Sequence, residues 1–370
     1  MTIDWHRILK KKWKICVIQY YGRSGSTFLH SLLDGHSKVL ALPIVGFQDF
    51  YTQTLPAKNE FTFSYYEPLI EALGFPNLIR SDKHKFFQAG RVDGNTETPD
   101  KLLEEVYKLP EINGGKFIEL MKGFFDSNLV SRKNTFLAFH ISYCLAAGMD
   151  LIEERDTILY QMHHPNEDAF RKILHDFSDV RLIQTIREPS NALASNLNFF
   201  SKIYPSGIPF WKLEQVLDRA FFAGHFYLGE YKAISIRLED LHNEPGKTLG
   251  GLAPFCGINL ESSLFQSSIL GKGIKWGYDS KSLFRSMDFQ WQYLRVFSSQ
   301  ERQCLAPFLS KQYEAWRYPM VEKKSDNCLL DCFEGIVEEE GKKKLKHYLS
   351  DLSNRLESYT NQKMIPSLKL

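Results

Sequence analysis

The chain has 370 residues, of which 43% are hydrophobic and 24% charged, a balance typical of a folded globular protein. Its 46 lysines and arginines nearly balance its 44 aspartates and glutamates, so the net charge gives no general reason to expect nucleic acid or a membrane surface as a partner. No apolar stretch approaches the roughly 20 residues of a transmembrane helix, and the charged start of the chain does not resemble a signal peptide. We therefore expect a cytoplasmic protein.

Short apolar runs alternate with segments of helical periodicity along the chain, which predicts an α/β fold around a parallel sheet. The predicted strands are 15–20, 135–139, 157–162, 180–186 and 233–238. Helices are predicted at 26–33, ended by Gly35, at 166–176, with Asn166 as N-cap, and at 191–199, after Pro189 in the first turn.

Composition changes twice along the chain. Residues 48–130 are rich in aromatic side chains and broken by proline and glycine, which predicts a mostly helical insertion that forms a substrate wall or lid. We expect one domain over 1–325 and a charged, solvated helical extension over 326–370. The six cysteines show no CxxC pair, so we expect buried free thiols and neither a disulfide framework nor a zinc site.

A loop rich in small residues follows the first predicted strand and precedes an amphipathic helix. Its glycines let the backbone turn tightly, and the free amides at the helix start favour an anion. Arg23 adds positive charge and the hydroxyls add donors, so we predict a phosphate-binding turn made by Gly22, Arg23, Ser24, Gly25, Ser26 and Thr27. A nucleotide triphosphatase loop would carry a lysine before the Ser/Thr pair, and this loop has none.

A second anion-binding element is predicted at the end of strand 180–186. Arg187 follows this strand, Pro189 opens the next helix, and Ser195 lies six residues into it. Ligands bind at the carboxyl ends of parallel strands, so we expect Arg187 and Ser195 to converge on one anionic group there.

Together the two elements resemble the sulfotransferases that use 3′-phosphoadenosine 5′-phosphosulfate (PAPS). In that family a strand-loop-helix binds the 5′-phosphosulfate and an Arg-x-Pro…Ser element binds the 3′-phosphate, which here correspond to Arg23–Thr27 and to Arg187 with Ser195. The segment 236–241, Ile-Arg-Leu-Glu-Asp-Leu, is also similar to a strand-end motif of the family. The resemblance implies a three-layer α/β sandwich of the P-loop type with helical insertions, and a sulfuryl transfer that needs no metal.

The match to the family has departures. Arg23 stands where soluble small-molecule members carry lysine, which makes the loop more like that of carbohydrate sulfotransferases. Phe28 takes the position of the tryptophan that stacks on adenine in many members. The family's late basic-glycine loop, which helps to hold the 3′-phosphate, is matched only loosely, by Lys272 and Gly273.

The general base is the least determined part of this reading. His163 follows strand 157–162 and matches the catalytic histidine of the family's Lys-Thr-His-Leu-Pro segment, with Gln161 in place of the lysine. A neutral histidine can accept the proton of an attacking hydroxyl. His164, His140 at the end of the predicted strand 135–139, and a carboxylate such as Asp49 remain alternatives.

The sequence thus predicts a PAPS-dependent sulfotransferase that acts on a hydroxyl or amine of a small-molecule or carbohydrate acceptor and releases 3′,5′-ADP. The expected partners are this acceptor and PAPS, with neither nucleic acid nor membrane, and a homodimer is allowed. A kinase-like phosphotransferase and a non-catalytic protein that binds PAPS or 3′,5′-ADP are the alternatives.

Overall fold

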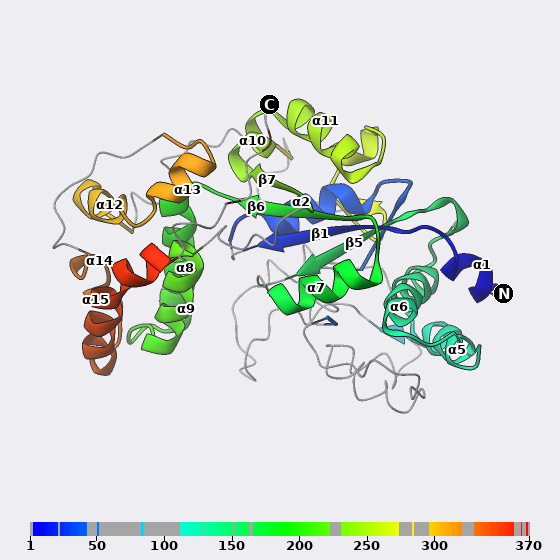
Figure 1. The fold of residues 1–370 in the computed structure, drawn as a ribbon, viewed down its shortest axis with the longest axis horizontal. Helices are drawn as coiled ribbons and strands as arrows, with labels where there is room; N and C mark the ends of the chain where they lie inside the picture. Colours follow the sequence, from blue (N-terminus) through cyan, green and yellow to red (C-terminus); the bar gives the residue numbers. More distant parts are fainter. Residues whose placement is uncertain are drawn as a thin grey trace. The chain divides into compact units, whose positions relative to one another are not determined.

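The computed structural model describes residues 3–20, 23–42, 50–51, 83–84, 112–127, 129–150, 152–162, 166–222, 231–273, 283–284, 296–319, 329–358, 364 and 368 (Figure 1). Within these ranges the chain forms two compact units. The first comprises Met1–Ile18, Thr27–Leu182 and Leu252–Leu283, and the second comprises Gln19–Ser26, Ile183–Gly251 and Phe284–Leu370. The sequence-predicted boundary near residue 325 stays a prediction.

A five-stranded parallel sheet confirms the predicted α/β class. Its order is β2-β5-β1-β6-β7, formed by Val39–Ala41, Thr157–Met162, Lys14–Tyr20, Val180–Ile186 and Lys232–Arg237. β2 lies parallel to β5, with Val39 beside Thr157 and Ala41 beside Leu159. Four of these strands were predicted, because strands that are buried on both faces appear as continuous apolar runs. The three-residue β2 is too short to give that signal.

Two small antiparallel pairs accompany the sheet. They are β3 (Lys83–His84) with β4 (Ile112–Asn113) and β8 (Ser268–Ile269) with β9 (Lys272–Gly273). The β8–β9 turn has positive φ at both central residues, 53° at Leu270 and 70° at Gly271, as a two-residue hairpin requires. Asp34, the last residue of helix α2 (Ser26–Asp34), accepts hydrogen bonds from the backbone N–H groups of both turn residues.

The helices of the first unit come before and after β5 along the sequence. Their bounds are α1 Trp5–Leu9, α2 Ser26–Asp34, whose first residue belongs to the second unit, α5 Gly114–Phe125, α6 Arg132–Ala146, α7 Glu167–Asp176 and the end of α11 Pro245–Cys256, with short 3-10 turns at Ile152–Glu154 and Ser262–Phe265. α5 and α6 lie side by side in Figure 1, and Phe117 of α5 contacts Phe139 of α6 edge to face. Asn166 caps α7 as predicted, because its side chain accepts the Ala169 N–H.

The predicted strand 135–139 is wrong, because these residues form the middle of α6. Ser131 caps this helix by accepting the Asn134 N–H, and residues 135–146 are all buried. A helix that is apolar on every side and a buried strand give the same pattern over five residues. The expected mostly helical insertion at 48–130 lies largely outside the described residues, although α5 belongs to it.

The second unit is built on a helical core. Its helices are α8 Pro189–Ile203, α9 Phe210–Phe221, α10 Leu238–Asn243, the start of α11, α12 Ser299–Leu305, α13 Ser310–Ala315, α14 Asp331–Glu334 and α15 Lys342–Ser358, with a 3-10 turn at Glu339–Gly341. The predicted C-terminal helix is present as α15, but it is not solvated on all sides. Leu345 and Leu352 are fully buried in the core that α8 and α9 also line.

The cysteines follow the prediction only in part. Cys16, Cys144, Cys256 and Cys332 are buried thiols that form no disulfide. Cys304 is disulfide-bonded, so the expectation of free thiols is wrong for it. Spacing along a sequence does not show which cysteines approach each other in the fold.

Candidate functional site

The loop between β1 and α2 adopts the tight turn that the sequence predicts. Arg23 has a φ of 52° and Gly25 a φ of 86°. A Cβ atom on Gly25 would lie 2.3 Å from Cδ1 of Leu238, a buried residue at the start of α10. Glycine is therefore required here both for the backbone angle and for space. Gly22, also predicted for this turn, lies outside the described residues.

Side chains tie this loop to β6 and α8. The Ser24 hydroxyl is buried and hydrogen-bonds the Thr185 hydroxyl of β6 at 2.9 Å. The exposed Arg23 donates through Nε to Oγ of Ser195 at 3.5 Å, and its guanidinium lies 5.2 Å above the ring of Phe199. The structure thus brings together Arg23 and Ser195, which are 172 residues apart in the sequence.

Arg187 is the most unusual charged residue of this region. It follows β6 and is only 8% exposed, yet among the described residues it makes neither a hydrogen bond nor an ion pair. Its Nε has no hydrogen-bond partner. Burial lowers the pKa of its guanidinium, Glu239 and Tyr318 raise it, and the neighbouring charge of Arg23 lowers it. Arginine stays charged in proteins, so this is a buried cation that has negative charge nearby but no directly bonded partner among the described residues.

Two buried carboxylates fix the backbone around Arg187. Glu239 accepts the N–H of Glu188 at 2.9 Å and the hydroxyl of Tyr318 at 2.6 Å. Glu188 caps α8 by accepting the Asn191 N–H at 2.6 Å. Glu188 also accepts hydrogen bonds from the Tyr313 hydroxyl and, at 3.3 Å, from Arg302. Desolvation raises the pKa of Glu188, and these donors oppose that rise.

The partners of these two carboxylates carry no recognisable sequence signal. Glu239 belongs to the strand-end motif at 236–241, which was recognised without a role. Arg302, Tyr313 and Tyr318 lie more than 100 residues beyond Arg187 in segments that carry no motif. Only the fold brings them to the end of β6.

A small cavity adjoins Arg187. Its volume is about 30 Å³, and it is lined by Ser24, Thr185, Ile186, Arg187, Pro189, Ala192, Leu193, Asn196, Arg219, Ala220 and Trp316. A cavity of roughly 10–15 Å³ holds one water molecule, so this cavity has room for a few ligand atoms and not for a whole nucleotide.

Other predicted ligand-binding residues lie in the first unit. Thr27 and Phe28 occupy the first turn of α2 and are half-buried. Lys272 and Gly273 form the exposed strand β9, and Gly271 in the turn before it donates its N–H to Asp34. Their part in binding a nucleotide stays a prediction.

The candidate bases are placed unequally. His163, His164 and Asp49 lie outside the described residues. His140 lies within α6, is fully buried, and donates through Nδ1 to the Phe136 carbonyl, 2.8 Å away. Burial lowers the pKa of His140 to about 3. Because His140 lies within α6, the prediction that it ends a strand is wrong, and its position supplies no other reason to assign it a base role.

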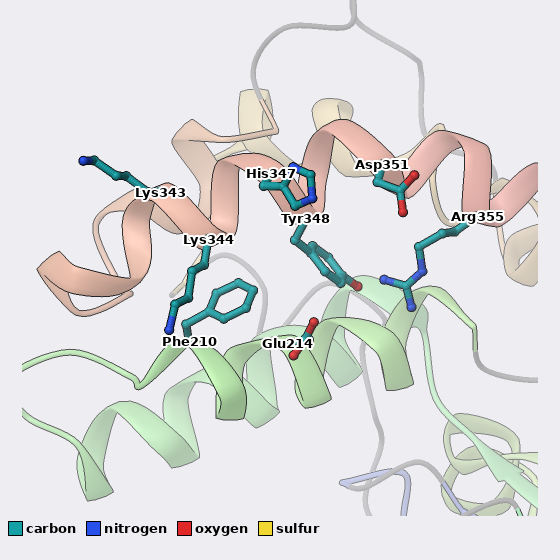
Figure 2. Close-up of a pocket in the computed structure, with 8 residues that line it drawn as sticks. All are labelled: Phe210, Glu214, Lys343, Lys344, His347, Tyr348, Asp351 and Arg355. Carbon is teal, nitrogen blue, oxygen red and sulfur yellow. The ribbon is translucent and has the colours of Figure 1, made fainter.

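A second cavity, about 430 Å³ and more open, lies between α9 and α15 in the second unit (Figure 2). Phe210 and Glu214 of α9 face the side chains of α15. At one end Tyr348 and Arg355 of α15 both bond Asp218 of α9 at 2.8 Å. None of the sequence-predicted site residues lines this cavity, which lies along the contact between α15 and α9.

In the described part of the chain, no group of three or more His, Cys, Asp or Glu side chains is arranged to hold a metal ion. Among the same residues, no helix combines the length and apolar character of a membrane span.

No protein-family model and no curated protein matches this sequence. Among solved structures, the sulfotransferase domain from the curacin biosynthetic pathway is similar at 14% identity and a TM-score of 0.41, over 95% of this chain and 99% of that one. The sulfotransferase domain of the Synechococcus PCC 7002 olefin synthase gives 14% and 0.40 over 77% and 94%. Sulfotransferase STF1 of Mycobacterium tuberculosis H37Rv gives 15% and 0.33 over 70% and 71%. The chain thus matches several sulfotransferase domains in structure over most of its length, at low sequence identity.

Proposed function

We propose that the protein is a PAPS-dependent sulfotransferase that transfers a sulfuryl group to a hydroxyl or amine of a small-molecule or carbohydrate acceptor and releases 3′,5′-ADP. The observation that carries this proposal is Arg187, a buried guanidinium without a partner among the described residues, next to a glycine-containing turn. A cytoplasmic location and a homodimer stay predictions from the sequence.

The charge at the end of β6 calls for an anionic ligand. A buried ion is costly unless a partner of opposite charge and hydrogen bonds compensate for the lost water. Glu239 and Glu188 lie near Arg187, but their oxygens already accept hydrogen bonds from backbone N–H groups and tyrosines. A phosphate monoester offers several acceptor oxygens and up to two negative charges, and therefore fits Arg187 better than a neutral group does.

The two halves of the site would then divide the nucleotide between them. Arg187 and Ser195 would hold the 3′-phosphate. Arg23 and the backbone of the Ser24–Ser26 turn would hold the 5′-phosphosulfate, at the start of α2, where free amides favour an anion. When bound, PAPS supplies the activated sulfuryl group and a phosphate leaving group.

The acceptor must lose a proton as it attacks. We assign this step to His163, with His164 and Asp49 as alternatives, on the sequence pattern alone. Arg23 would stabilise the negative charge that moves onto the leaving phosphate, since donors aimed at developing charge lower the barrier most effectively. A hydroxyl on a carbohydrate or polar metabolite is the acceptor that the arginine in the loop favours.

Titration calorimetry with 3′,5′-ADP and 5′-AMP tests the donor site. The native protein should bind 3′,5′-ADP at least tenfold more tightly, and Arg187→Ala should remove that preference, since a hydrogen bond to a charged group contributes about 1.5–3 kcal/mol. Arg171→Ala, which removes an exposed arginine of α7, is the matched control. Equal affinity of the native protein for both nucleotides would refute the proposal.

A second assay separates catalysis from binding. Transfer of labelled sulfate from PAPS to a panel of sugars, phenols and amines should show turnover that His163→Ala lowers roughly 10²–10⁴-fold while 3′,5′-ADP affinity is kept. Tight binding without transfer to any acceptor would indicate the non-catalytic alternative, and Mg-ATP binding in place of 3′,5′-ADP binding would indicate the phosphotransferase.

A further inference from the structure

Trp316 is a second buried donor without a partner at the end of β6. It follows α13, is 3% exposed, and its indole Nε1 has no hydrogen-bond partner among the described residues. Buried indole N–H groups usually find an acceptor, so an orphan of this kind calls for an explanation.

Trp316 and Arg187 line the same small cavity. Nε of Arg187 and Nε1 of Trp316 are both buried donors without partners, and Arg219 of α9 lines the cavity beside them. The hydroxyls of Ser24 and Thr185, which also line it, already bond each other. A group that only accepts hydrogen bonds fits such a lining, and the oxygens of a phosphate are acceptors of this kind, of which the cavity has room for about two or three.

The turn after α13 fixes Trp316 in this position. Arg317 has a φ of 58°, its N–H bonds the Glu314 carbonyl at 3.1 Å, and the Tyr318 N–H bonds the Tyr313 carbonyl at 2.9 Å. These two bonds define a Schellman helix end. The two tyrosines that flank the turn donate hydrogen bonds to the buried carboxylates near Arg187. Tyr313 donates to Glu188, and Tyr318 donates to Glu239. The backbone that carries Trp316 is therefore linked through the same carboxylates to the backbone that carries Arg187.

We propose that Trp316 is a specificity-determining residue of this site, whose indole N–H donates to the phosphate that Arg187 binds, with Arg219 as a further cation. This inference rests on the proposed function and extends it. It states that an uncharged donor, the indole N–H of Trp316 in the C-terminal part of the chain, takes part in recognising the nucleotide's 3′-phosphate. The ligand class is a nucleoside bearing a 3′-phosphomonoester.

The test is a comparison of nucleotide affinities in Trp316→Phe, which keeps an aromatic ring and removes the N–H. We expect affinity for 3′,5′-ADP to fall roughly 10- to 100-fold, the effect of losing a hydrogen bond to a charged group, while affinity for 5′-AMP stays unchanged. Trp211→Phe is the control, since Trp211 lies on α9 and is 50% exposed. Quenching of tryptophan fluorescence by 3′,5′-ADP should be reduced in Trp316→Phe and kept in Trp211→Phe.

The possible results separate this inference from the proposed function. A native protein without preference for 3′,5′-ADP over 5′-AMP would overturn both. A native protein that has the preference, with Trp316→Phe keeping it in full, would overturn the role of Trp316 alone. If Trp316→Phe does not fold, Arg219→Gln serves as the second variant, and a full preference for 3′,5′-ADP in that variant would overturn the assignment of the cavity to the 3′-phosphate.

Discussion

Gly25 offers the sharpest test of the loop geometry, because its substitution by alanine creates two separable costs. The first is backbone strain, since φ is +86° and an L-residue in this region costs about 1–2 kcal/mol. The second is steric. The new Cβ would lie 2.3 Å from Cδ1 of Leu238, which is 8% exposed and has little room to move, and overpacking of this kind costs about 1–3 kcal/mol. Gly25→Ala should thus lower the free energy of unfolding by about 2–5 kcal/mol.

Gly148 provides the matched control. Its φ is +81°, and a Cβ there would meet nothing within 4 Å. Gly148→Ala therefore carries the strain without the contact and should cost about 1–2 kcal/mol. Urea denaturation of both variants measures the difference, and equal losses would refute the steric argument.

A double substitution isolates the contact with Leu238. In a Leu238→Ala background the side chain that blocks the new Cβ is gone, so the additional cost of Gly25→Ala should fall to that of Gly148→Ala. A cost that stays as large as in the native background would show that Leu238 does not confine the turn. In the native background Gly25→Ala should also weaken 3′,5′-ADP binding, because the contact with Leu238 forces the turn that carries Arg23 and Ser24 to shift.

Three further predictions concern stability. Burial lowers the pKa of His30 to about 4 and that of His140 to about 3. Below pH 6.5 these histidines therefore take up protons in the unfolded chain but not in the folded one. The free energy of unfolding should for this reason fall from pH 6.5 toward pH 4. His140→Leu should reduce that slope by up to about 1.4 kcal/mol per pH unit in urea titrations, and an unchanged slope would contradict the assignment. Arg317→Gly should raise the thermal midpoint through relief of about 1 kcal/mol of strain at its positive φ, whereas Arg317→Ala should not. Asp34→Asn should destabilise the protein by about 1–3 kcal/mol, since an amide cannot accept at both positions where the carboxylate accepts from Ser268, Leu270 and Gly271; unchanged hydrogen exchange of the turn amides would contradict this.

The elements that could be predicted from the sequence are those whose signal is local. Strand β6 and the first-turn proline of α8 were predicted because an apolar run, an arginine and a proline follow one another directly. The placement of Arg23 and Ser195 at one site could be predicted because each lies at a predicted strand-to-helix connection, and such connections share one edge of a parallel sheet. Their direct hydrogen bond was not predicted.

The elements that could not be predicted depend on tertiary packing. The run 135–139 gives no sign that it lies in a helix covered on all sides. The charged pattern of α15 hides the fact that Leu345 and Leu352 are spaced seven residues apart on one buried face. Trp316 and Tyr318 come from a segment without any motif, and only the fold shows that they adjoin Arg187.

The charges at the end of β6 explain why binding of an anionic ligand should stabilise the fold. The positive charge of Arg23 acts on the buried guanidinium of Arg187 and opposes the effect of the carboxylates of Glu239 and Glu188. Burial is the main cause that lowers the pKa of Arg187, and the charge of Arg23 adds to it. A phosphate monoester brings about −1.5 to −2 at pH 7, so its binding would offset both effects and give the buried guanidinium an anion to bond. A nucleotide with a 3′-phosphate should for this reason stabilise the fold by about 2.7 kcal/mol at a concentration 100 times its Kd, and a nucleotide without that group, at the same concentration, by less.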